Sequence, residues 1–406
     1  MKYRYYDHKK DRKAMNQIFK EVGWIEGNNY DGVDILVKDS DSILAEINNN
    51  PECIVSSNIG EMKYLNEKLP ASFITNITTS FVARKRKLAR ELTAQKIVID
   101  VEKGAAVSLL GMFDQGFYEM LGFGSGNYKT TVKFSPSTLK IKKHFNVPTR
   151  LTKKDWKKVY SSRIKRLCGH GACNLNSVIT KSETAWFNTG FGLGYFDNKI
   201  LTHHIWLTGM GKEHGPYRIM WMSYQNYDQF LELMALIKSL GDQIKLIVML
   251  EPPNIQLMDF LEKPFFYRNI TRASKFVNEI TTGAYWQIRI CNLKKCISKT
   301  HLKGDPVTFN LELYDPIEKF LPKNNNWNGL TGKYIITFGK RSKVKNGYDK
   351  NLQTLKASVN AFTRFWMGIL PANSLSMNDD FVASEELIEK LDELFILPKP
   401  DVNWEF

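Results

Sequence analysis

A strand, a helix and a second strand follow one another in residues 72–110, and this order constrains the fold of the chain more than any other feature. Residues 72–82 are rich in β-branched and aromatic side chains, which predicts a strand. Apolar side chains then share one helical face, at Leu88, Leu92 and Ile99. Residues 105–110 form a short apolar run bounded by glycines, which is typical of a buried strand. We therefore expect a βαβ unit with a right-handed crossover, in a parallel or mixed sheet.

The same order of elements recurs in the middle of the chain. Residues 218–224 and 245–250 predict strands, and residues 227–240 predict the helix between them. This second unit has no basic loop between its first strand and its helix. We interpret it as a degenerate copy of the first unit with a structural role.

Both ends of the chain carry further elements. Residues 2–25 predict a short strand and a helix, and two more short strands are expected at residues 35–37 and 53–55. In the last region, alternating apolar side chains predict antiparallel strands at 307–313 and 334–338, and helical spacing predicts helices at 357–368 and 385–395.

A basic loop lies between the first predicted strand and its helix. It contains four consecutive cations, Arg84, Lys85, Arg86 and Lys87, and the helix begins near Leu88 and Ala89. A helix start presents free amides and the positive end of the dipole, so it binds anions. Because acidic side chains are normally favoured there, the cations indicate a bound anion such as a pyrophosphate. The alternative is a basic first turn without a ligand.

The composition narrows the classes of partner. The net charge of +15 is compatible with nucleic acid, with an anionic cofactor or with a solvated basic surface. No nucleic-acid motif accompanies the charge, so we expect no specific nucleic-acid binding. No apolar run approaches the roughly 18–20 residues of a membrane span. We also expect no signal peptide, and the five cysteines indicate reduced thiols in the cytoplasm.

Histidine and cysteine pairs do not predict a metal site. His203 and His204 are adjacent but have no third ligand at metal spacing. The cysteine pairs Cys168/Cys173 and Cys291/Cys296 do not match the spacing of zinc sites. We expect all of these side chains to be structural or free.

A tyrosine motif follows the second strand of the βαβ unit. Phe117 and Tyr118 precede the turn Gly122-Phe123-Gly124. This pattern resembles the end of the acyl-CoA site in the GNAT acetyltransferase superfamily. The loop Arg84-x-x-Lys87-x-Ala89 resembles that superfamily's motif R/Q-x-x-G-x-G/A. Over nearly its full length the chain resembles the enhanced intracellular survival (Eis) branch, most weakly through the middle.

This resemblance implies an α/β (α+β) fold of three domains. Two GNAT-like mixed-sheet domains, at 1–147 and 148–298, would be followed by a sterol-carrier-like domain at 299–406. A cluster of lysines around Pro148 supports the first boundary. The resemblance also implies a hexamer.

The resemblance further implies an N-acetyltransferase that moves an acetyl group from acetyl-CoA to the amine of a small molecule or of a lysine side chain. Backbone groups of Ser80 and Val82 would pair with the pantetheine. The pyrophosphate would bind Arg84, Lys85, Arg86, Lys87, Leu88 and Ala89. Tyr118 would be the general acid, and the terminal carboxylate of Phe406 would reach back into the first domain. A core tyrosine and a simple packed terminus are the respective structural alternatives.

One position departs from the motif. Lys87 stands where the family has glycine, which permits positive φ and a close approach to phosphate. The lysine either obstructs the loop or binds phosphate through its own charge. The alternatives to catalysis are therefore a catalytically impaired protein that keeps the CoA-binding fold, or lipid binding by the C-terminal domain.

Overall fold

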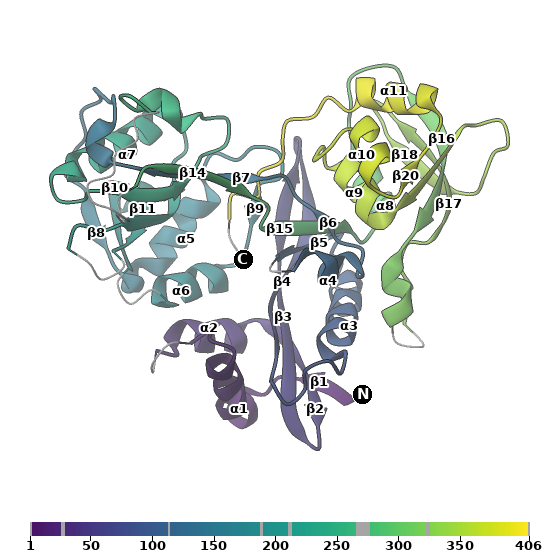
Figure 1. Cartoon of the computed structure of the whole chain (residues 1–406), viewed down its shortest axis with the longest axis horizontal. Helices are drawn as coiled ribbons and strands as arrows, with labels where there is room; N and C mark the ends of the chain where they lie inside the picture. The colour runs from purple at the N-terminus through teal and green to yellow at the C-terminus, as the bar shows by residue number, and fades with distance from the viewer. Residues whose placement is uncertain are drawn as a thin grey trace.

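The computed structural model contains three β-sheets, each covered by helices (Figure 1). The structure describes residues 2–25, 29–112, 114–186, 190–209, 213–264, 277–321 and 325–404. Within these ranges, no helix is both long and apolar enough to cross a bilayer.

The first sheet has the strand order β1-β2-β3-β4-β5-β15-β6, with β9 paired to β3. Its strands are β1 (Lys2–Tyr5), β2 (Asp41–Ile47), β3 (Asn50–Tyr64), β4 (Glu67–Thr79), β5 (Val107–Gly111), β6 (Gly124–Ser125), β9 (Cys173–Asn174) and β15 (Trp286–Ile290). Its helices are α1 (His8–Glu21), α2 (Asp31–Asp39), α3 (Leu88–Glu102) and α4 (Gln115–Glu119). The predicted βαβ unit is confirmed, because β4 and β5 are parallel and α3 connects them.

Alternating side chains place helices on both faces of this sheet. Leu44 and Ile54 pack against α1 and α2, whereas their neighbours Ile43 and Val55 pack in the cluster that contains the first turns of α3. The short strand predicted at residues 35–37 is wrong, because this stretch belongs to α2. The apolar side chains of α2 are spaced for one side of a helix, with Val33 and Val37 packed in the same cluster as α1 and Leu36 in a neighbouring one.

The second sheet has the strand order β14-β7-β13-β12-β11-β10-β8. Its strands are β7 (Lys129–Phe134), β8 (Thr149–Leu151), β10 (Gly190–Asp197), β11 (Ile200–Thr208), β12 (Tyr217–Ser223), β13 (Ile247–Leu250) and β14 (Glu279–Gly283). Its helices are α5 (Trp156–Ile164), α6 (Ser177–Trp186) and α7 (Tyr227–Ser239). The predicted second unit is confirmed, because β12 and β13 are parallel and α7 lies between them in the chain.

The third sheet has the strand order β18-β17-β16-β19-β20. Its strands are β16 (Val307–Tyr314), β17 (Gly332–Phe338), β18 (Lys343–Asn346), β19 (Thr354–Ser358) and β20 (Phe381–Val382). The helices in this part of the chain are α8 (Leu293–Ser298), α9 (Val359–Trp366), α10 (Ala372–Asn378) and α11 (Glu385–Leu394).

Short 3₁₀ turns occur at η1 (Pro136–Thr138), η2 (Lys153–Asp155), η3 (Leu240–Asp242), η4 (Leu257–Phe260) and η5 (Pro316–Phe320).

The first two sheets exchange strands across the expected domain boundaries. β7 lies before residue 147 but pairs in the second sheet, and β15 lies before residue 298 but pairs with β5 in the first. A boundary drawn at one position in the sequence therefore divides neither sheet correctly.

The chain after α11 returns to the junction of the first two sheets. Val402 accepts a hydrogen bond from the amide of Cys173 (3.0 Å), and Asp401 donates its amide to the carbonyl of His170 (2.9 Å). Trp404 is buried there. The last described residues therefore lie between the first two sheets, whose residues are far from them in the sequence, as Figure 1 shows.

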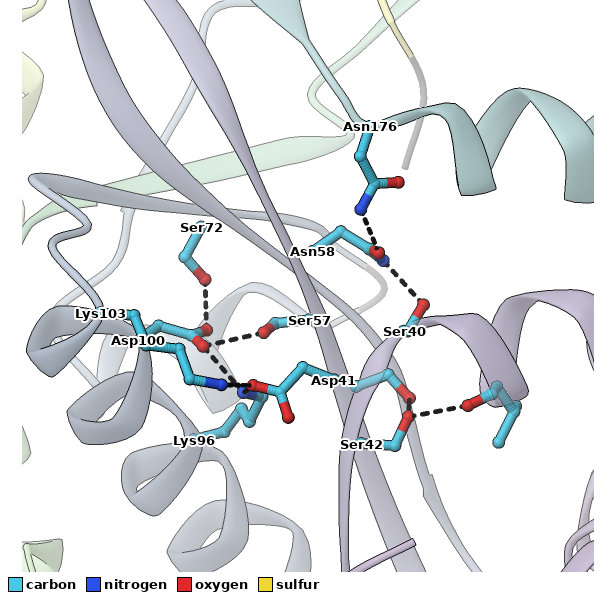
Figure 2. Close-up of polar contacts among 12 residues, drawn as sticks. Ser40, Asp41, Ser42, Ser57, Asn58, Ser72, Lys96, Asp100, Lys103 and Asn176 are labelled. Atoms are coloured by element: carbon cyan, nitrogen blue, oxygen red, sulfur yellow. Dashed lines mark hydrogen bonds and ion pairs between the residues drawn. The ribbon is translucent and has the colours of Figure 1, made fainter. Parts of the chain in front are cut away.

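A charged network fastens α3 to the first sheet. Lys96 is fully buried and forms ion pairs with Asp41 (2.6 Å) and Asp100 (2.8 Å). Figure 2 shows Ser57 and Ser72 directing their hydroxyls at Asp100 from the strands. The network satisfies charges that would otherwise be costly to bury.

The network also gives the first domain a pH dependence. Burial opposes ionisation of Asp41, but hydrogen bonds from Lys103 and Lys96 outweigh it and lower the pKa of that carboxyl from its usual 3.8. A carboxyl whose pKa is lower in the folded than in the unfolded state stabilises the fold at any pH above its unfolded-state pKa. This contribution is therefore complete above about pH 4 and is lost as the pH falls through the lowered pKa.

We predict that Lys96→Met lowers the free energy of unfolding by about 3–5 kcal/mol, because it leaves the buried carboxylate of Asp100 without a cation. Urea denaturation followed by tryptophan fluorescence measures the loss. Lys68→Met is the matched control, since Lys68 is 69% exposed in its ion pair with Glu61 and should cost less than about 1 kcal/mol. Equal losses for the two variants would contradict the structural role of Lys96.

Candidate functional site

The parallel pair β4–β5 separates partway along its length. The strands pair from Ala71 opposite Val107 to Ile74 opposite Leu110. β4 then continues to Thr79, still paired with β3 on its other side. In the described part of the chain, no strand pairs with residues 75–79 on the β5 side. This stretch of β4 therefore offers a free edge of backbone donors and acceptors.

A β-bulge accompanies the separation. Ile54 lies opposite Thr78 and Ser56 lies opposite Thr75, so Val55 faces two residues of β4. One of these is Asn76, which has φ +54° and therefore a left-handed backbone. A bulge increases the local twist of its strand. It therefore turns the end of β4 at the point where pairing with β5 stops.

Helix α3 begins beside this free edge without a side-chain cap. Its first intrahelical bond runs from the amide of Glu91 to the carbonyl of Lys87 (3.2 Å), and the Lys87 side chain caps nothing. By contrast, Asn226, Ser358 and Ser384 cap α7, α9 and α11. The first amides of α3, at residues 88–90, are thus of the kind that binds an anion.

The loop before α3 keeps a backbone suited to glycine. Lys87 has φ +65° and Lys85 has φ +61°. A side chain in this conformation costs about 1–2 kcal/mol. Both lysine side chains are exposed. The departure from the glycine motif therefore adds a solvated cation and leaves the left-handed path of the backbone in place.

The other residues predicted to bind the pyrophosphate lie in the same loop and in the first turn of α3. Arg84 and Arg86 are exposed in the loop beside the two lysines. Leu88 is buried and Ala89 is half-buried in the first turn of α3. These consecutive residues lie at the start of α3, and their contact with a pyrophosphate stays a prediction.

Ser80 and Val82 differ from the expectation. The predicted strand to residue 82 is too long, because β4 ends at Thr79. The amide of Ser80 donates to the carbonyl of Glu52 (2.9 Å) and its hydroxyl donates to the carboxylate of the same residue. Val82 lies in the following turn and is 72% exposed. The free strand edge therefore lies before these two residues.

Tyr118 lies in α4, which begins at its cap Asp114. The ring is buried in the same apolar cluster as Ile74 and Leu110, the last paired residues of the two separating strands. Burial, and secondly the charge of Asp114, raises the pKa of the Tyr118 hydroxyl to about 12. The phenol therefore keeps its proton at neutral pH.

Side chains of α9 and β15 hold the turn that carries Tyr118. The side-chain amide of Asn360, on α9, donates to the carbonyls of Glu119 (2.9 Å) and Phe123 (3.1 Å). Arg289 donates to the carbonyl of Leu121 and is itself paired with Asp315 (2.7 Å). The carbonyls on both sides of the turn are thus fixed by side chains from distant parts of the chain.

The glycines of this turn are explained by close contacts. Gly122 has φ +81°, and a Cβ there would lie 2.8 Å from Arg289 Nη1. A Cβ at Gly124 would lie 2.6 Å from the carbonyl oxygen of Asn360. Neither position can take a side chain without displacing the groups that hold the turn.

A cavity of about 380 Å³ lies where the first two domains meet. Thr75 and Asn76, on the free edge of β4, line one side. α6 and β12 of the second domain line the other, and the returning segment contributes Asp401, Asn403 and Trp404. The sequence did not predict this cavity, because its walls come from many stretches that are distant in the sequence. Phe406, the predicted terminal carboxylate, lies outside the described residues.

The histidines and cysteines make structural contacts. His203 approaches Glu232 (3.2 Å), and His204 accepts a hydrogen bond from Trp221 (3.0 Å). All five cysteines are free thiols. Among the described residues, no three metal-binding side chains come together.

Solved structures with the same architecture match the whole chain. One is a conserved protein of unknown function and probable N-acyltransferase from Enterococcus faecalis V583 (TM-score 0.79, 14% identity, 100% of this chain and 99% of that one). Another is a GCN5-related N-acetyltransferase from Anabaena variabilis ATCC 29413 (TM-score 0.77, 14% identity, 100% of both chains). A third is Eis1 from Mycobacterium abscessus (TM-score 0.75, 11% identity, 100% of both chains).

These matches show that the chain has the GCN5-related N-acetyltransferase (GNAT) fold. No protein-family model and no curated protein matches the sequence. The predicted fold class is therefore confirmed by structure alone.

We predict that Asn360→Ala loosens the tyrosine turn, because it removes both hydrogen bonds from α9. Hydrogen exchange of residues 115–125 should accelerate about tenfold, the effect of losing roughly 1–1.5 kcal/mol of hydrogen bonding. Asn310→Ala is the matched control, since the Asn310 amide also donates to two carbonyls, Asp349 (2.8 Å) and Leu352 (3.1 Å), but within the third domain. Acceleration at residues 115–125 in both variants, or in neither, would contradict the specific role of Asn360.

Proposed function

We propose that this protein is an acetyl-CoA-dependent N-acyltransferase that acetylates a primary amine. The observation that carries the proposal is the separation of β4 from β5, which leaves a free strand edge between an uncapped helix start and the cavity. The fold shared with solved acetyltransferases supports it.

The residues present fit the chemistry of acetyl-CoA. An extended pantetheine carries amides that can pair with the free edge of β4 at residues 75–79. The pyrophosphate would be held by the first amides of α3 and by the cations Arg84, Lys85, Arg86 and Lys87. We propose this edge in place of Ser80 and Val82, because the backbone of Ser80 is already hydrogen-bonded to Glu52.

The reaction must remove two protons from the acceptor nitrogen. A primary ammonium has a pKa of about 10.4 and attacks only as the free amine. Its lone pair forms the N–C bond to the thioester carbonyl, the C–S bond breaks, and CoA leaves as a thiolate. The acylated nitrogen then loses its second proton, and the thiolate gains one. The balance is one proton released from each ammonium consumed.

Tyr118 is the proposed donor to the leaving sulfur. With its pKa raised to about 12, the phenol is protonated at neutral pH and can donate a hydrogen bond as negative charge develops on sulfur. A thiol has a pKa of about 8.5, so complete transfer from Tyr118 is uphill and its proton must be restored from solvent. The terminal carboxylate of Phe406 is proposed to orient the amine and to receive its proton through water.

The finer features implied by the family resemblance remain proposals as well. These are the Eis-type assignment, the sterol-carrier character of the third domain, the hexamer and the cytoplasmic location.

We expect purified protein to release CoA from acetyl-CoA when a primary amine is added, and CoA to raise its melting temperature. Tyr118→Phe should lower kcat by about 100-fold, because the leaving thiolate loses its donor, while Kd for CoA changes less than twofold. A thiol-detection assay measures kcat, and calorimetry measures Kd. The proposal fails if no amine in a broad panel releases CoA and CoA does not protect against heat.

The substitution Lys87→Gly separates catalysis from the impaired-binder alternative. It should relieve the strain of the left-handed residue by about 1 kcal/mol and remove one phosphate-binding charge. We expect CoA affinity to fall by about two- to fivefold, with the ligand still bound. If CoA binds only the Lys87→Gly variant, the lysine obstructs the loop and the natural protein has lost its cofactor.

A further inference from the structure

The walls of the cavity are mostly aromatic and apolar. Six aromatic side chains line it, from both domains, the segment between β14 and β15, and the returning C-terminal segment: Trp24, Trp186, Trp221, Tyr224, Tyr285 and Trp404. Methionines of β12 and β13 add to the apolar surface. Such walls favour a ligand with a flat or aliphatic body.

The charges in the cavity cancel. Three carboxylates line it, but cations that line the same space pair with two of them. Arg163 is paired with Glu183, and Lys129 is paired with Asp401. The guanidinium carbon of Arg163 also lies 4.3 Å from the ring centre of Trp221 and 3.8 Å from that of Trp404. These cation–π contacts stabilise the position of the guanidinium.

The two remaining charged groups are opposite in sign. Arg166 is buried and donates to neutral acceptors, including Asn403 Oδ1 (3.0 Å) and the carbonyl of Cys173 (2.7 Å). Glu251 accepts a hydrogen bond from the amide of Leu257 (2.8 Å). Among the described residues, the lining therefore carries no surplus of negative charge. The single terminal carboxylate proposed above would bind one ammonium group and leave none for a second.

From this lining we infer the class of acceptor, an inference that rests on the proposed function. The acceptor is a primary amine on an aromatic or aliphatic body that carries no second cationic group. Polyamines and other polycations are poor acceptors, because each further ammonium would be buried against apolar walls or against carboxylates already neutralised.

A matched pair of substrates tests the charge argument. Hexylamine and 1,6-diaminohexane have the same length and differ in the second amino group. With acetyl-CoA, kcat/KM for hexylamine should exceed that for 1,6-diaminohexane by at least tenfold, counted per amino group. We expect 2-phenylethylamine to equal or exceed hexylamine. A diamine that reacts as fast as the monoamine would overturn the inference.

A pair of variants on one strand tests the cause. Lys129→Met removes the cation that neutralises Asp401 in the cavity, so the preference for the monoamine should fall at least threefold. Lys133→Met is the control, since Lys133 is on the same strand and pairs with Glu279 outside this lining. An unchanged preference in Lys129→Met, or an equal change in both variants, would contradict the charge argument.

A binding measurement separates this inference from the proposed function. Four tryptophans line the cavity, so titration with each amine in the presence of CoA should quench their fluorescence at a lower concentration of hexylamine than of 1,6-diaminohexane. Preferential quenching without turnover would support the acceptor class and defeat catalysis. Turnover that favours the diamine would defeat the acceptor class and leave catalysis standing.

Discussion

A strand inside a sheet must satisfy the hydrogen-bonding groups on both of its edges, and β4 meets this demand for only part of its length. Residues 75–79 of β4 pair with β3 alone, since pairing with β5 ends at Ile74 and Leu110. The bulge at Asn76 turns the strand at this point. The position of α3, the cavity beside Thr75 and the placement of Tyr118 all follow from where the two strands part.

The rest of the molecule keeps the separated strands in place. The ion pair of Lys96 with Asp41 and the hydrogen bonds from Ser57 and Ser72 to Asp100 attach α3 to the sheet, so the helix start stays beside the free edge. Arg289 and Asn360 hold the tyrosine turn from the opposite side. The third sheet and its helices thus contact the first sheet through Asn360 at this turn and through an apolar core that is continuous with that of the first sheet.

Local patterns in the sequence predicted the elements well where side-chain spacing determines them. The units β4-α3-β5 and β12-α7-β13 were both predictable, because each buries a regular apolar pattern. The helix α2 was misread as a strand, since three apolar residues in a row fit either period. The loop cations and Tyr118 were found from their motifs. The buried charges Lys96 and Asp100 and the walls of the cavity were not predictable, because they depend on which distant segments meet.

The exchange of β7 and β15 between sheets has a consequence for how this architecture can change. β15 lies between β5 and β6, so the first sheet is complete only after the chain has passed through the second and come back. Neither half can be inherited, lost or replaced as a free module by a single recombination event. β7 and β15 each cross from one half to the other and so link the position of the two halves. The shape of the cavity between them therefore depends on both halves.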